Sequence, residues 1–240
     1  MPYRNKEFAG LIFLIAAFAC VPSTCAQAAR GAAPDLNAKL ARKADFVPND
    51  ESTLDRLVAI AKQYEIPMGI EWIGGVGEED LELPAAAVPR TPTVRDLLTA
   101  IVSRLPDYQL SIENGVVHIA PPVFAVREDN FLNLLIEEFR IKNENLFGAQ
   151  YYLKIAIEMT LHPKDDGGYG GGYGYGPDHV FAKRQFSYKS ANLTVRQILD
   201  GLINTNGNAL WIAEFDREDF VPPAKPEPEW RFEPLGEKLN

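Results

Sequence analysis

The chain has 240 residues and is acidic, with 24 basic against 33 acidic side chains and a formal net charge of −9. This balance argues against a nucleic-acid partner, because phosphate binding needs a basic face. Hydrophobic residues make up 46% and aromatic residues 10% of the chain, which is enough for a buried core.

The first 28 residues have the pattern of a cleavable secretory signal. Basic Arg4 precedes an apolar run at 11–19, and the small residues Ala26 and Ala28 suit the pocket of a signal peptidase. The run is only about half of the roughly 20 residues that span a bilayer. We therefore predict cleavage near Ala28 and a periplasmic or secreted protein without a transmembrane segment in the mature chain.

Both cysteines of the chain, Cys20 and Cys25, lie within this predicted signal. The mature protein would therefore have no thiol for a disulfide, a soft metal or nucleophilic attack. It would keep 22 basic and 32 acidic side chains, a net charge of −10. A lipid anchor at Cys20 is the alternative, but bulky Phe18 suits a lipidation site poorly.

The next elements are predicted from capping residues and periodicity. The Ala-rich stretch 29–43 is predicted to be a linker, and a short strand is expected around Phe46. A capping box at 52–55 opens a helix that runs to about residue 64. The alternation at 66–72 then predicts a strand with one buried face.

A helix and a hairpin follow. A short strand is expected at 81–83, and a second capping box at 93–96 opens a helix with one apolar face. Asn114-Gly115 between alternating stretches predicts a type I′ turn. The pairs formed across that turn would be Ile112 with Val117 and Leu110 with Ile119, all on one face.

The same order of elements is predicted to recur after Pro121-Pro122, which breaks the ladder and marks a boundary. At an offset of 47 residues, FRIKNENLFGAQYY at 139–152 shares five positions with FSYKSANLTVRQIL at 186–199. Strict alternation at 151–161 predicts a strand after the first copy. The second copy predicts a helix up to about residue 203, followed by a strand at 209–213.

Two segments of unusual composition complete the chain. The loop 167–176, GGYGGGYGYG, is predicted to be mobile, and its Tyr169, Tyr173 and Tyr175 are candidate contacts for a glycan, a peptide or another copy. The proline-rich tail 222–240 is predicted to be extended chain without regular hydrogen bonds, although Trp230 and Phe232 could dock on a lobe.

Two stretches together resemble the short N-terminal (STN-like) domain of secretins and TonB-dependent receptors. They are STLDRLVAIAKQYEIPMGIEWI and TPTVRDLLTAIVSRLPDYQLSIENGVVHIAPP. The resemblance covers residues 44–121, and 130–221 resembles a diverged second copy through NLTVRQILDGL. It implies an α+β fold of two tandem β-α-β-β-α-β-β lobes, each with two helices packed on small sheets. It also implies a periplasmic interaction module without catalysis. The barrel or channel that normally follows such a domain has no counterpart in this sequence.

No catalytic, cofactor or metal motif stands out in the sequence. The glycines at 74–77 lack the lysine and spacing of a nucleotide loop. Metal ligands could come from both sides of the 167–176 loop, but flexible chain separates them. His118 is predicted to be a solvated residue on the strand face opposite the core. The candidate metal ligands are His162, Asp165, Asp166, Asp178 and His179.

Two functions therefore follow as expectations. The first is a non-catalytic exported interaction protein of the bacterial cell envelope that binds a protein or an envelope polymer. The alternative is a secreted hydrolase with a carboxylate-based site between the lobes, for which the acidic clusters 78–82 and 137–138 are the candidates. The sequence favours the first, and it indicates neither the partner nor the oligomeric state.

Overall fold

A computed structural model describes residues 36–45, 52–74, 92–163, 184–215 and 229–235. The predicted signal 1–28, the loop 167–176 and the short strands expected around Phe46 and at 81–83 lie outside these described residues. The mixed α+β class is confirmed, with two sheets. In spatial order the strands of the main sheet are β2 (Gln109–Glu113), β3 (Val116–Ala120), β1 (Met68–Ile73), β6 (Ala209–Phe215) and β7 (Trp230–Pro234).

Strand β1 lies at the centre of this sheet and is parallel to both of its neighbours. The two edge strands, β2 and β7, are antiparallel to the strands beside them. A second sheet is a two-stranded antiparallel ribbon of β4 (Leu135–Glu144) and β5 (Phe186–Thr194). The described helices are α1 (Leu36–Leu40), α2 (Thr53–Tyr64), α3 (Val94–Val102), α4 (Pro122–Ala125), the 3-10 turn η1 (Phe131–Asn133), α5 (Leu146–Leu161) and α6 (Val195–Asn206).

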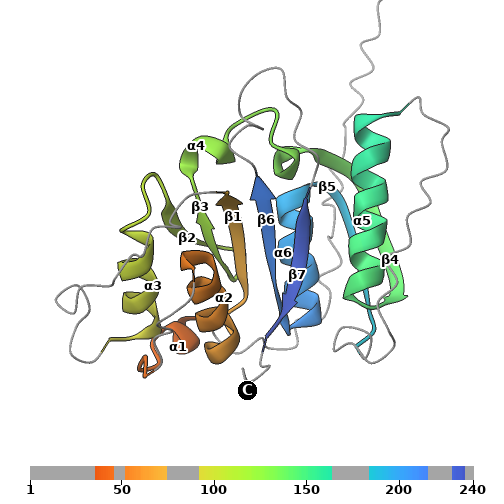
Figure 1. Cartoon of the computed structure of the whole chain (residues 1–240). Coiled ribbons are helices and arrows are strands. Elements are labelled where there is room, and N and C mark those ends of the chain that lie inside the picture. Colours follow the sequence, from red (N-terminus) through yellow and green to blue (C-terminus); the bar gives the residue numbers. More distant parts are fainter. Residues whose placement is uncertain (1–35, 46–51, 75–91, 164–183, 216–228, 236–240) are drawn as a thin grey trace, which may run out of the picture. The chain divides into compact units, whose positions relative to one another are not determined.

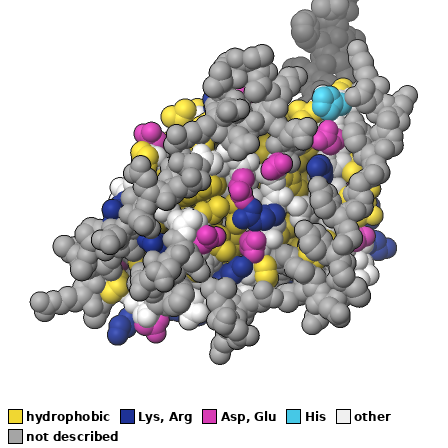
Figure 2. All heavy atoms as spheres, in the orientation of Figure 1, with side chains coloured by type: hydrophobic (Ala, Val, Ile, Leu, Met, Phe, Trp, Pro, Cys, Tyr) yellow, Lys and Arg dark blue, Asp and Glu magenta, His cyan; other side chains and the backbone are white. Residues whose placement is uncertain are grey.

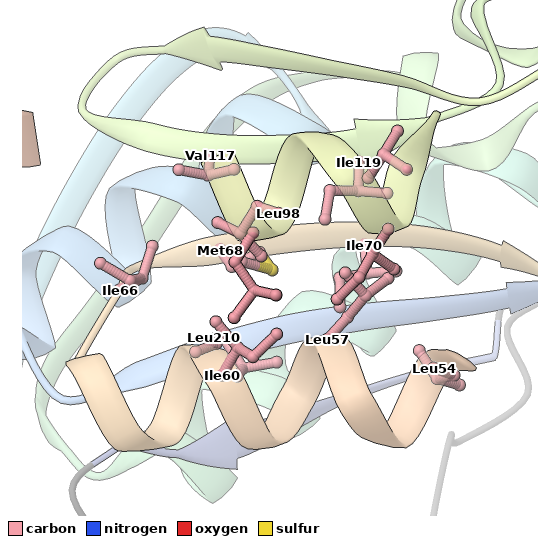
Figure 3. Packing of buried hydrophobic residues seen from close by; sticks show 14 of the residues in the cluster. Leu54, Leu57, Ile60, Ile66, Met68, Ile70, Leu98, Val117, Ile119 and Leu210 are labelled. Atoms are coloured by element: carbon pink, nitrogen blue, oxygen red, sulfur yellow. The ribbon is translucent and has the colours of Figure 1, made fainter. Parts of the chain in front are cut away.

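Helices cover both faces of the main sheet (Figure 1). On one face, α2 and α3 pack on apolar side chains of β1, β3 and β6, and Figure 3 shows Leu57, Ile60 and Leu98 directed at Met68 and Ile70. On the other face, α6 packs on the sheet. The β4–β5 ribbon packs on α5 and α6, so that α6 lies between the two sheets.

Several local predictions are confirmed. Ser52 caps α2 by accepting a hydrogen bond from the Asp55 backbone, and Thr93 and Asp96 form a full capping box at α3. The hairpin pairs Ile112 with Val117 and Leu110 with Ile119, as the turn predicts. Both residues of the Asn-Gly turn have positive φ angles, as a type I′ turn requires.

Two tandem lobes are not confirmed. Strand β6, which follows Pro121-Pro122 in the sequence, pairs with β1, which precedes it. Both stretches therefore contribute to one sheet. The internal repeat does correspond to two strand-helix units, β4 with α5 and β5 with α6, but their strands pair with each other in the ribbon. An isolated lobe would leave the edge of β1 that now pairs with β6 without hydrogen-bond partners.

The strand predicted at 151–161 is wrong, because this stretch belongs to helix α5. Eight of the eleven residues there are apolar, so the alternation also fits a helix with a buried stripe. Asn145 begins the helix by accepting a hydrogen bond from the Gly148 backbone, with 2.9 Å between Oδ1 and N. The buried stripe consists of Leu146, Ala149, Leu153 and Ile157.

The predictions for the stretch 29–43 and for the proline-rich tail need correction. The stretch 29–43, expected to be a linker, contains α1, whose Leu40 is buried in the core. The tail, expected to lack regular hydrogen bonds, contains β7, which pairs with β6 over five residues. Trp230 and Phe232 are buried on the α5/α6 side of the sheet, and this apolar burial favours the strand within a proline-rich segment.

Candidate functional site

A layer of polar side chains lies between the main sheet and α6. Side chains alternate along a strand, so the residues between Met68, Ile70 and Trp72 point away from the α2/α3 core. The prediction that β1 has one buried face is therefore incomplete, because all six of its residues are buried. On the α6 side, β1 presents Gly69 and Glu71.

His118 is buried, and the prediction of a solvated residue is wrong. Its side chain lies on the sheet face opposite the α2/α3 core, as the alternation predicts, but α6 covers that face. Its Nε2 lies 3.1 Å from Oδ2 of Asp200, which belongs to α6. Only 5% of His118 and 2% of Asp200 is exposed. A carboxylate can only accept hydrogen bonds, so Nε2 of the imidazole carries the proton.

Trp211 of β6 completes this first cluster. Its indole Nε1 donates to Oδ1 of Asp200 at 3.0 Å, so both carboxylate oxygens are engaged. The indole also meets the His118 ring edge-on, with 5.8 Å between the centroids. Gly69, beside Trp211 in the sheet, makes room for the indole, because a Cβ there would collide with it. We call His118, Asp200 and Trp211 the histidine cluster.

A second cluster surrounds Glu71, which is 1% exposed. Nε of Arg196, from the first turn of α6, donates to Oε1 of Glu71 at 2.6 Å. Nη1 of the same guanidinium donates to Oδ1 of Asn133 at 2.6 Å. Asn130 donates to Oε2 of Glu71 at 3.3 Å and to the backbone carbonyl of Phe124 at 3.0 Å. We call Glu71, Arg196, Asn130 and Asn133 the arginine cluster.

A tyrosine lies near each cluster, and Tyr108 is buried whereas Tyr188 is half-buried. Burial raises the pKa of Tyr108 to about 12, a shift that a hydrogen bond from the Ile73 backbone opposes and the Glu71 charge reinforces. The Tyr108 hydroxyl oxygen accepts that bond at 2.9 Å. Burial likewise raises the pKa of Tyr188, whose ring leaves no room for a Cβ at Gly201 of α6. Both tyrosines therefore keep their protons at neutral pH.

The two clusters align α6 with the sheet. Glu71 and Asp200 are each held by a basic side chain and by further donors in fixed positions. A two-carboxylate hydrolase instead needs its carboxyl groups to face each other across the substrate. Buried polar pairs of this kind fix one arrangement of the packed elements, because any other arrangement would leave a charge without its partner.

The site residues singled out from the sequence lie elsewhere. Tyr169, Tyr173 and Tyr175 are outside the described residues, as are Asp165, Asp166, Asp178, His179 and the acidic cluster 78–82. His162 is exposed at the end of α5, with Nε2 4.0 Å from a carboxylate oxygen of Glu158. Glu137 and Glu138 are exposed on β4. Within the described part of the chain, no group of three or more candidate ligands is placed to hold a metal.

Sequence reasoning missed the partners of both clusters, although a signal was present. Glu71 and His118 are polar residues inside the apolar strands MGIEWI and VVHIA. A polar residue at such a position needs a buried partner. Arg196 and Asp200 are four residues apart and therefore lie on one helix face, the spacing that two neighbouring partners would need.

Helix α5 carries an apolar surface that no described residue buries. Its inner stripe packs on β4, α6 and β7. On the outside, Tyr152 is 44% and Met159 is 60% exposed. Figure 1 shows α5 beside the ribbon, and Figure 2 shows hydrophobic side chains next to charged ones in its vicinity. We call Tyr152, Ile155 and Met159, which share a side of the helix at spacings of three and four residues, the outer face of α5.

The edge of the sheet near α5 has a different surface. Lys62 Nζ lies 2.9 Å from Glu233 Oε2, and Arg231 contacts both Glu233 and Glu214. Basic and acidic side chains gather over β6 and β7 in Figure 2. Charged side chains on an edge strand discourage the addition of another strand. The outer face of α5 is therefore the more suitable surface for an apolar contact.

The described residues define a mixed α+β protein with a buried polar layer and an exposed apolar face on α5. The chain matches no family model, no curated protein and no solved structure. Among the described residues, no helix is long and apolar enough to cross a membrane.

Proposed function

We propose that the protein is a non-catalytic interaction protein of the bacterial cell envelope, which binds another protein through the outer face of α5. The observation that carries the proposal is the mismatch between the composition of α5 and its burial. Apolar side chains extend round α5 beyond its buried stripe, and a helix normally buries most of its apolar surface. In α5 only Leu146, Ala149, Leu153 and Ile157 are buried.

Two further observations support the proposal. The export signal predicted at 1–28 would deliver the chain to the envelope. The buried carboxylates of Glu71 and Asp200 are engaged by fixed side chains, which suits a scaffold better than a hydrolase. A protein is favoured over an envelope polymer as the partner, because exposed aromatic and Met side chains are typical of protein interfaces.

A photoreactive amino acid at position 152 tests the proposal in cells that produce the full chain naturally. We expect adducts with protein at position 152 and none at position 138, since Glu138 is exposed on β4 and pairs there with Lys189. Adding Met159→Lys should abolish the adducts, because the contact is apolar. Adducts with carbohydrate would point to a polymer partner instead. A chain without adducts at position 152 would contradict the proposal.

A further inference from the structure

We propose that the outer side of the β4–β5 ribbon binds an anionic lipid surface through Arg140, Lys142 and Lys189. The observation that carries the proposal is that one side of this ribbon gathers three exposed basic side chains, in a chain whose formal net charge is −9. The ribbon side is separate from the outer face of α5. The inference therefore goes beyond the proposed function, and either can fail while the other holds.

The alternation along the strands places the three basic side chains on one side of the ribbon. Phe139 and Ile141 of β4 are buried in the core cluster that includes residues of α5 and α6. Neighbouring residues of a strand point to opposite sides, so Arg140 and Lys142 point away from both helices. Lys189 of β5 is the direct partner of Arg140, and directly paired residues share a side.

The charges on this side are only partly balanced. Lys189 Nζ lies 3.3 Å from Oε1 of Glu138, which alternation places on the same side. Among the described residues, the side chains of Arg140 and Lys142 form no ion pair. Arg140 and Lys189 face each other directly, and like charges at paired positions destabilise a sheet. An anion beside this pair would remove the repulsion.

The other acidic residues of β4 do not neutralise this side. Glu137 precedes Glu138 and belongs to the opposite side by alternation. Glu144 lies against α5, because a Cβ at Gly148 would collide with its carboxylate. The ribbon side therefore has a local excess of positive charge, in contrast to the acidic chain as a whole.

An anionic lipid surface fits the ribbon side better than a single phosphate ion does. Each exposed ion pair contributes little by itself. A lipid surface presents many anionic groups in one plane, so three basic side chains on one side of a ribbon can contact it at the same time. The acidic remainder of the protein is screened beyond about 8 Å at physiological ionic strength. The ribbon should therefore lie against the lipid, with the rest of the protein away from it.

Sedimentation with vesicles tests the proposal on the full chain purified from its own cells. We expect binding to vesicles of phosphatidylglycerol and phosphatidylcholine, none to vesicles of phosphatidylcholine alone, and weaker binding as salt is raised. Arg140→Gln, Lys142→Gln and Lys189→Gln should each lower the partition coefficient about fivefold, and the triple variant should lose binding. Residues 1–28 are the same in every variant, so they cannot produce these differences.

Two further variants make the test specific, and circular dichroism checks that each keeps the fold. Glu138→Gln removes the acidic residue of the ribbon side and should raise the partition coefficient about fivefold. Lys43→Gln removes an exposed positive charge beside Thr93, at the start of α3, and should leave binding unchanged.

Three results would overturn the inference. The parent chain could stay in the supernatant with the anionic vesicles, or the triple variant could bind as the parent does. Displacement from the vesicles by inorganic phosphate at constant ionic strength is the third, because the ribbon would then bind single ions. The adducts expected at position 152 do not depend on this test, since that position lies on α5.

Discussion

The two faces of the main sheet are built from the same strands but are stabilised in different ways. Toward α2 and α3, the sheet presents Met68, Ile70 and Val117, which pack as ordinary apolar core. Toward α6, the alternate residues include Glu71 and His118, each held by a polar partner on α6. Apolar side chains of similar volume can pack in several arrangements of helix and sheet. A buried polar pair allows only the arrangement that brings its two partners together.

The largest effect is expected from a charge placed in either apolar cluster. Two substitutions place an unpaired carboxylate at a fully buried position. They are Leu98→Asp on α3 and Leu199→Asp on α6. Each should cost more than about 4 kcal/mol and unfold the protein. Because both helices pack on one sheet, loss of structure should extend over both faces, as judged by circular dichroism and hydrogen exchange.

The matched control for this pair is Leu98→Met, which keeps the volume and should cost less than about 1.5 kcal/mol. If Leu98→Asp unfolds the α2/α3 side while the ribbon and α6 stay protected from hydrogen exchange, the two faces are independent units. That result would restore the expectation of separate lobes.

The second effect concerns the arginine cluster. Arg196→Met removes the guanidinium and leaves Glu71, 1% exposed, without its counter-charge. We expect a loss of about 3 kcal/mol in the free energy of unfolding, measured by denaturant titration. The double variant Arg196→Met/Glu71→Met should recover most of this loss, since no buried charge is left alone. Failure of the double variant to recover would mean that the guanidinium acts through packing and not through its charge.

A smaller effect is expected in the histidine cluster. Asp200→Ala leaves the Trp211 indole N–H and the His118 ring without their acceptor, and both are buried. The expected cost is about 2 kcal/mol. Thermal unfolding measures it, and the near-ultraviolet circular dichroism of Trp211 should change with it. An Asp200→Ala variant that melts like the parent would show that α6 is aligned without this cluster.

The smallest effect belongs to Tyr108 and depends on pH. Tyr108→Phe removes the acceptor of the Ile73 N–H and should cost about 1 kcal/mol at neutral pH. The pKa of Tyr108 is about 12 in the fold, against about 10 in an unfolded chain. The folded state thus holds the proton more tightly, and this stabilisation is complete below pH 10 and lost as the pH rises to 12.

The difference in melting temperature between the parent and Tyr108→Phe should therefore shrink between pH 10 and pH 12. Tyr152→Phe provides the control for the loss of a tyrosine hydroxyl at an exposed position, because Tyr152 is 44% exposed. A difference in melting temperature between the parent and Tyr108→Phe that stays constant up to pH 12 would contradict the burial of the Tyr108 hydroxyl.

The sequence by itself determined the local structure of the α2/α3 side. The capping box of Thr93 and Asp96 and the turn at Asn114-Gly115 each involve only two to four neighbouring residues. Their hydrogen bonds therefore follow from the local sequence. The alternation in β1 correctly predicted which side chains meet α2. It could not show that the opposite face is buried too, because that depends on a helix more than a hundred residues later in the chain.

Only the tertiary structure decided how the two halves combine. The pairing of β1 with β6 and the return of β7 to the sheet join distant segments, and no local pattern specifies which strand lies beside which. The polar layer has the same origin. Glu71 is separated by 125 residues from Arg196, and His118 by 82 from Asp200. A buried polar residue signals that a partner is needed, whereas the fold selects the partner, because only packing brings the two side chains within hydrogen-bond distance.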